Sequence, residues 1–148
     1  MLENVRTERV ALSDFNGEVP LYVRRGGASS LNATHYGLKY RNSIPVLVLR
    51  LDDLPDIRGR VDFLKIDAEG SELAILRGGM KVIHEFAPTI ALEVHCESAI
   101  EDGKCKCATC DFLRGNGYAL ETLGEMATPS QVHWVWATPE ASGREVSP

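Results

Sequence analysis

Residues 61–73 read VDFLKIDAEGSEL, and the organisation of the chain follows from this stretch. Its first six residues form a compact apolar run with β-branched ends, which is typical of a strand buried in a parallel sheet. Residues 67–70 form the turn, and Ser71 is a suitable N-cap for a helix that carries Leu73 and Leu76 on one face. A strand that leads through a short acidic turn into a helix predicts an α/β unit.

The remaining segments alternate between strand-like and helix-like patterns. Strands are predicted where short runs are β-branched or alternate in polarity. The predicted strands span residues 5–12, 18–23, 45–51, 61–66 and 89–94, and the further predicted helices span 80–86 and 111–116, with a long loop at 24–43 and a terminal antiparallel strand pair at 118–123 and 132–137. We therefore expect an α/β fold with a mostly parallel sheet over residues 1–137, followed by a disordered tail at 138–148.

Composition and charge narrow the function classes. The 148 residues are 44% hydrophobic and 25% charged, which is the composition of one ordinary globular domain. The net charge of −5 offers no basic face, so we expect no nucleic-acid partner. No apolar run approaches the roughly 20 residues that span a bilayer, so no membrane association is expected. The first residues show no basic region followed by an apolar one, which predicts a cytoplasmic location.

Polar side chains stand where two of the predicted strands end. Asp67 and Glu69 follow the first of these strands, and Glu93 and His95 alternate at the end of the second, so the latter two point to the same face. In open α/β sheets, ligands bind outside the carboxyl ends of the strands. We therefore place the functional site at these four residues.

Each of these features also has a purely structural explanation. Acidic residues at the start of a helix offset the helix dipole. Glu93 lies inside an apolar strand and needs a partner, which Lys65 or a neighbouring backbone group would supply. His95 is either a hydrogen-bonded histidine at a sheet edge or a general base. The residues alone leave these alternatives open.

Several motifs occur in a fixed order along the chain. They are residues 62–72 (DFLKIDAEGSE), 76–79 (LRGG) and 92–95 (LEVH), preceded in order by 11–17 (ALSDFNG), 28–31 (ASSL) and 51–54 (LDDL). Together they resemble the signature of FkbM-type methyltransferases. Several motifs in order, spread over roughly residues 4–137, are much more specific than one short pattern. The resemblance implies a Rossmann-like class I methyltransferase fold that transfers a methyl group from the cofactor S-adenosylmethionine, usually to an oxygen. We expect the acceptor to be a small molecule or a sugar, and the sequence leaves a protein acceptor open as well.

The resemblance also implies which residues contact the cofactor. Ala11 and Leu12 would end the third strand of the methyltransferase fold. Ser13 and Asp14 would follow in the loop beside the adenine. Asp67, at the end of the fourth strand, would lie beside the methyl-donor centre.

The same resemblance implies the residues that act on the acceptor. Asp67 would orient or deprotonate the acceptor hydroxyl, with Glu69 or His95 assisting. Glu93 and His95 would face the acceptor from the fifth strand. Methyl transfer depends strongly on in-line alignment of donor and acceptor, so positioning contributes alongside any base.

The chain departs from the family pattern at its start. No glycine-rich turn follows a first strand, and no second strand ends in an acidic residue for the ribose. We therefore expect an N-terminally truncated, C-terminal portion of a longer enzyme, inactive alone, with an exposed edge on the fourth strand that invites homodimer formation. A non-catalytic binding or scaffold remnant of a methyltransferase is the main alternative, and a different Rossmann-like, nucleotide-binding enzyme is a weaker one.

Four cysteines lie close together in the sequence, at Cys96, Cys105, Cys107 and Cys110. Four thiolates can form a closed tetrahedral zinc site, and the spacing of the last two suits a metal knuckle. The single residue between Cys105 and Cys107 suits it less well. Loop thiols that bind no metal are the favoured alternative, because such spacings specify zinc loosely.

Overall fold

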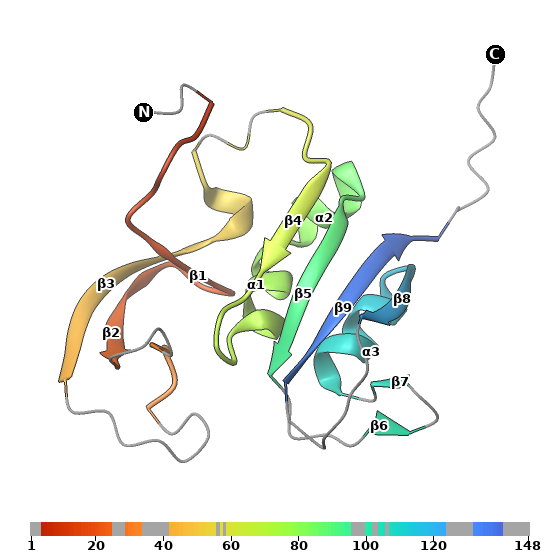
Figure 1. Cartoon of the computed structure of the whole chain (residues 1–148). Coiled ribbons are helices and arrows are strands. Elements are labelled where there is room, and N and C mark those ends of the chain that lie inside the picture. Colours follow the sequence, from red (N-terminus) through yellow and green to blue (C-terminus); the bar gives the residue numbers. More distant parts are fainter. Residues whose placement is uncertain are drawn as a thin grey trace.

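The computed structural model describes residues 4–24, 29–33, 42–55, 57, 59–95, 100–101, 104–105, 107–123 and 132–140. These residues form two main sheets, one on each side of the molecule as viewed in Figure 1. In the described part of the chain, no helix is long and apolar enough to cross a membrane.

The first sheet contains three strands in the order β1-β3-β2. Strand β1 (Ala11–Ser13) pairs in parallel with β3 (Asn42–Arg50), and β2 (Gly17–Val23) pairs antiparallel with β3. Directly after β3, the short 3-10 helix η2 (Leu51–Asp53) begins. The side chain of its Asp52 accepts hydrogen bonds from the backbone N–H groups of Lys81 (3.0 Å) and Val82 (3.1 Å), and so caps a helix far along the chain.

The second sheet contains four strands in the order β4-β5-β9-β8. Strands β4 (Phe63–Ile66) and β5 (Thr89–His95) are parallel neighbours, and β9 (Val132–Pro139) pairs antiparallel with both β5 and β8 (Tyr118–Leu123). Two short strands, β6 (Ile100–Glu101) and β7 (Lys104–Cys105), form a separate antiparallel pair.

The prediction of a mostly parallel sheet is wrong, although the α/β fold class and the terminal antiparallel pair are confirmed. Among the described strands, β1–β3 and β4–β5 are parallel and the other four pairings are antiparallel. Strand β2 runs back along β3, and β9 lies between β5 and β8 in the opposite direction. Alternation of polarity indicates a half-buried strand, but it does not fix the direction of the neighbouring strand.

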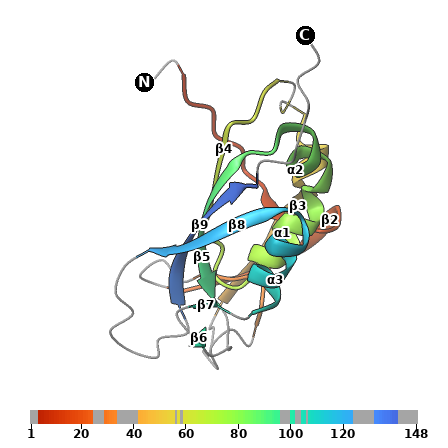
Figure 2. The same cartoon turned by 90° about the vertical axis from the view of Figure 1, so that its right-hand side faces the viewer.

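Three helices cover one face of the second sheet (Figure 2). They are α1 (Glu72–Gly78), α2 (Met80–Phe86) and α3 (Ala108–Gly115). Successive side chains of a strand point to opposite faces of the sheet, so the inward side chains of the helices pack on every second residue of each strand. The core so formed includes Ile66, Ile75, Leu76, Ile83, Ile90, Leu92, Val94, Leu113 and Val135.

Helix α1 also joins the two sheets. A Cβ atom on Gly78 would lie 2.0 Å from the carbonyl oxygen of Ser13, so the helix packs directly on the β1 backbone. Only a residue without a side chain allows this approach, which gives a physical reason for the first glycine of the LRGG motif.

The opposite face of the second sheet is not covered by these helices. Phe63 is 47% exposed there and its ring packs against that of Trp136, with centroids 5.5 Å apart. The ammonium group of Lys65 lies 5.2 Å from the centroid of the Trp134 ring. The predicted strand at 61–66 is therefore buried on one face only, and among the described strands β4 is an edge strand with β5 as its neighbour.

Several predicted boundaries shift in the structure. The first strand is limited to residues 11–13, and α3 begins three residues earlier than predicted, at Ala108. Strand β9 continues to Pro139, because its ladder with β8 pairs Thr138 with Ala119 and Pro139 with Tyr118. Two residues of the predicted disordered tail therefore belong to the sheet. Residues 141–148 lie outside the described residues.

Candidate active site

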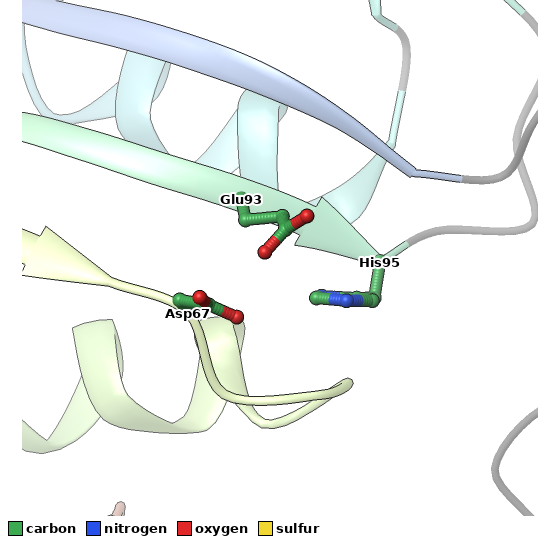
Figure 3. A group of neighbouring side chains, drawn as sticks. All are labelled: Asp67, Glu93 and His95. Atoms are coloured by element: carbon green, nitrogen blue, oxygen red, sulfur yellow. The ribbon is translucent and has the colours of Figure 1, made fainter. Parts of the chain in front are cut away.

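Three polar side chains converge where β4 and β5 end. Because the two strands are parallel neighbours, their carboxyl ends meet at the same edge of the sheet. Asp67 follows β4 directly, while Glu93 and His95 belong to the end of β5. Figure 3 shows the three side chains pointing toward one another, and one oxygen or nitrogen atom of each lies within 4.8 Å of the others. The three residues that the sequence places at one site are therefore neighbours in the fold, and their role stays a prediction.

The turn that follows Asp67 is held in an unusual backbone conformation. Glu69 has a φ of 47° and Gly70 a φ of 93°, both in the left-handed region. The Ser30 hydroxyl donates a hydrogen bond to the Glu69 carbonyl oxygen at 2.8 Å. This bond ties the turn to residues 29–33, which also form a bridge with β2 through Tyr22. A non-glycine residue at positive φ needs such support from its surroundings.

Glu72 holds the inner side of the site, a role that the sequence does not reveal. Its side chain is almost fully buried, and Oε1 accepts hydrogen bonds from the backbone N–H groups of Gly70 (2.9 Å) and Ala68 (3.3 Å). The same oxygen lies 2.7 Å from Nδ1 of His95. The sequence predicts only an acidic residue that offsets the dipole of α1. The sequence feature that could have indicated this role is the position of Glu72 at the start of α1, in a chain whose next strand, β5, ends in His95.

Asp67 and Glu93 form a carboxyl pair. Nζ of Lys65 lies 2.9 Å from Oδ2 of Asp67. This hydrogen bond lowers the pKa of the Asp67 carboxyl below its ordinary value, although partial burial acts in the opposite direction. Burial raises the pKa of Glu93, and its hydrogen bond to Asp67 raises it further. The pKa values of the two carboxyl groups therefore move apart, and Glu93 is the one that takes up a proton first as the pH falls. The predicted alternative, a Lys65–Glu93 pair, gives way to a Lys65–Asp67 pair.

His95 lies between this pair and two further glutamates. Its side chain is 4% exposed, and Nε2 lies 3.5 Å from a carboxylate oxygen of Glu69. Burial alone would lower the pKa of the ring, but the hydrogen bond to Glu72 and the charges of the surrounding glutamates raise it above its ordinary value. Glu69 thus reaches the site through His95, and all four residues expected to act on the acceptor lie in one network.

A cavity of about 470 Å³ opens beside the network. It lies between the two sheets, since it is lined both by the end of β1 and by the turn after β4. Its lining residues include Ala11, Leu12, Ser29, Ser30, Asp67, Glu69 and Glu93. Ser13 and Asp14, the other residues expected to contact the cofactor, do not line it. Ser13 is buried beneath α1, and Asp14 is exposed.

The cysteine cluster is only partly described. Cys107 and Cys110 are buried thiols at the start of α3, where the Cys107 sulfur accepts a hydrogen bond from the backbone N–H of Cys110 at 3.5 Å. Cys96 and the side chain of Cys105 lie outside the described residues. The zinc hypothesis therefore stays a prediction.

Comparison with known protein families identifies the chain. Residues 4–120 match the family described as the methyltransferase FkbM domain. The chain belongs to this family. Membership assigns methyl transfer as the general activity of this FkbM domain and confirms the resemblance seen in the motifs. Neither the curated proteins nor the solved structures gave a match.

Proposed function

We propose that this FkbM domain transfers a methyl group from S-adenosylmethionine to a hydroxyl oxygen of a small molecule or sugar. One observation carries the proposal: the carboxyl pair Asp67–Glu93 lines a cavity at the carboxyl ends of two parallel strands. That is where α/β sheets bind their ligands. The parallel β4–β5 pair, together with the antiparallel strand β9 between β5 and β8, supports a Rossmann-like, class I arrangement for the second sheet.

The cavity suits one part of the proposed methyl donor. Its volume of about 470 Å³ falls within the range of small-molecule sites. Ala11, Leu12 and Leu21 offer apolar surface for an adenine ring, while the carboxylates at the other wall favour a cationic sulfonium. The glycine-rich turn and ribose-binding acid of the family pattern are not found in the sequence, so we expect weak donor binding by these 148 residues.

The carboxyl pair suits proton removal from a hydroxyl. When bound, S-adenosylmethionine supplies a methyl group on a positively charged sulfur. The acceptor oxygen forms a bond to that carbon as the carbon–sulfur bond breaks, and S-adenosylhomocysteine leaves with a neutral sulfur. The hydroxyl proton passes to the Asp67 carboxylate, which its lowered pKa keeps ionised. His95, fixed by Glu72, helps to hold the acceptor in line.

Donor binding tests the proposal on the chain itself. Saturation-transfer difference NMR detects weak ligands, and we expect a signal from S-adenosylhomocysteine with the wild-type chain. Ser29→Trp, which fills the cavity, should abolish that signal. Ala33→Trp, an exposed position on the same segment that does not line the cavity, should leave it unchanged.

Two results would contradict the proposal. One is the absence of any signal from the wild-type chain at millimolar ligand, which would favour the binding or scaffold alternative. The other is an equal signal from both tryptophan variants, which would place the donor elsewhere. Thermal unfolding of each variant checks that it has folded.

A further inference from the structure

The contact between Asp67 and Glu93 requires a positive charge or a proton between the two carboxyl groups. One oxygen of Asp67 and one of Glu93 lie within 4.8 Å of each other, and two carboxylates this close repel unless one of them is neutralised. Lys65 pairs with Asp67 from one side, and no ion pair within the described residues reaches Glu93. The second ionisable neighbour is His95, whose side chain is buried. Two oxygens and one nitrogen therefore face a common point.

The histidine is oriented as metal ligands commonly are. A histidine that binds a metal usually engages a carboxylate with its other ring nitrogen, which fixes the ring and raises its basicity. Here Nδ1 of His95 lies 2.7 Å from Glu72, so Nε2 is turned toward the side of Glu69 and the carboxyl pair. Glu72 is itself fixed by the N–H groups of Gly70 and Ala68. The ring orientation is thus set before any ion arrives.

We propose that Asp67, Glu93 and His95 bind one divalent metal ion of the Mn²⁺ type. Two carboxylates and one imidazole are a donor set that suits Mn²⁺, because carboxylates favour hard ions and the imidazole favours a first-row transition metal. One ligand atom of each residue lies within 4.8 Å of the others, which is compatible with a single shared ion (Figure 3). On binding, the ion replaces the protons of the site, since all three ligands must be deprotonated.

The position of the ion gives it a role that rests on the proposed function. Three protein ligands leave about three positions of an octahedral ion for water or substrate. Asp67 and Glu93 line the cavity, so those positions are directed toward it. An acceptor with two adjacent oxygens, such as a vicinal diol or a hydroxy acid, could occupy two of them. The ion would then lower the pKa of the reacting hydroxyl and fix its orientation.

Direct Mn²⁺ binding tests the site independently of activity. The chain is stripped with EDTA, exchanged into buffer at about pH 8, where the ligands deprotonate more readily, and titrated with MnCl₂ while electron paramagnetic resonance records the unbound ion. We expect one equivalent of bound Mn²⁺ per chain. Asp67→Asn and Glu93→Gln should each weaken binding about tenfold or more. Asp62→Asn removes an exposed carboxylate just before β4, paired with Arg60, and should leave binding unchanged.

Glu72→Gln provides a second, more specific readout. Loss of an outer carboxylate typically weakens metal affinity about 10- to 100-fold without removing a ligand. Circular dichroism and thermal unfolding confirm that each variant is folded. No bound Mn²⁺, or equal binding by wild type, Asp67→Asn and Glu93→Gln, would overturn the proposal and leave the pair as a proton-sharing pair only.

Mn²⁺ binding and methyl-donor binding can be tested independently of each other. Donor binding is measured in EDTA, so a donor signal without Mn²⁺ binding overturns the metal site alone. Mn²⁺ binding without a donor signal overturns the methyl-donor proposal and leaves the metal site standing.

Discussion

Oε1 of Glu72 lies 2.7 Å from Nδ1 of His95, and the same oxygen accepts hydrogen bonds from the backbone N–H groups of Ala68 and Gly70 in the turn after β4. One buried carboxylate thus links the start of α1, the turn after β4 and the end of β5. The geometry of the candidate site depends on this residue, although it does not line the cavity.

Replacement of Glu72 should therefore cost stability as well as site geometry. Glu72→Ala removes the acceptor that the N–H groups of Ala68 and Gly70 and the buried ring of His95 share, and we expect a loss of about 2–3 kcal/mol in the free energy of unfolding. Glu72→Gln keeps an acceptor oxygen and should cost about 1 kcal/mol. Urea unfolding measures both, with the exposed Glu85→Ala on α2 as control. Equal losses for the alanine and glutamine variants would show that these hydrogen bonds contribute little.

Contact between α1 and β1 should make Gly78 intolerant of a side chain. A Cβ atom there would lie 2.0 Å from the Ser13 carbonyl oxygen, so Gly78→Ala should destabilise the fold by about 3 kcal/mol. Gly115 also ends a helix, but a Cβ atom added to it would meet no atom within 4 Å, and Gly115→Ala should stabilise the chain by about 0.5 kcal/mol. Thermal unfolding compares the two variants. Similar unfolding temperatures would mean that the two sheets are not joined through this contact.

His133 should make stability fall as the solution becomes acidic. Burial lowers the pKa of its ring, with opposing contributions from Cys107, which raises it, and His95, which lowers it. The unfolded chain takes up a proton near pH 6.5 that the folded chain resists, so folding stability is present above this pH and declines below it. Its Nε2 has no hydrogen-bond partner among the described residues, so no local contact compensates for the charge.

Urea unfolding at about pH 7.5 and about pH 5.5, on either side of the ordinary histidine pKa, tests this pH dependence. His133→Gln should lose less stability than the wild type between these two values, because it removes the titrating group. His84→Gln, at an exposed position on α2, should behave like the wild type. If His133→Gln and the wild type lose the same stability between the two pH values, the buried ring of His133 is not the group that titrates.

The uncovered face and edge at β4 should promote self-association. Phe63 is 47% exposed on the edge strand of the second sheet, beside Trp136. Exposed apolar edge strands tend to pair with other chains. Phe63→Lys should therefore shift the chain toward monomer in light scattering after size exclusion. An unchanged mass distribution would indicate that this edge takes no part in association.

The sequence correctly predicts helices and strands whose ends are marked by nearby residues such as glycine and proline. Helix α2 occupies residues 80–86 as expected, because Gly79 and Pro88 bound it, and β8 and β9 pair as predicted. Asp67 and His95 can be brought together from the sequence because the ends of parallel strands share one edge. Strand alternation carries no information on direction, so it does not reveal the antiparallel β2–β3 pair.

Contacts between distant segments account for the rest. The bond from Ser30 to Glu69 and the cap of α2 by Asp52 join residues that no local pattern connects. The role of Glu72 is hidden in the sequence for the same reason, since its partner His95 lies on another element. The family motif places Ser13 beside the cofactor, whereas α1 packs over its carbonyl group.

The methyl donor should bind in the cavity beside the turn that follows β4. Two-dimensional amide NMR of the ¹⁵N-labelled chain, titrated with S-adenosylmethionine, locates the donor residue by residue. We expect the largest shifts at Ala11, Leu12, Ser30, Asp67 and Ala68, the residues around the cavity. An absence of shifts at millimolar donor, or shifts confined to α3 and β8, would contradict the account.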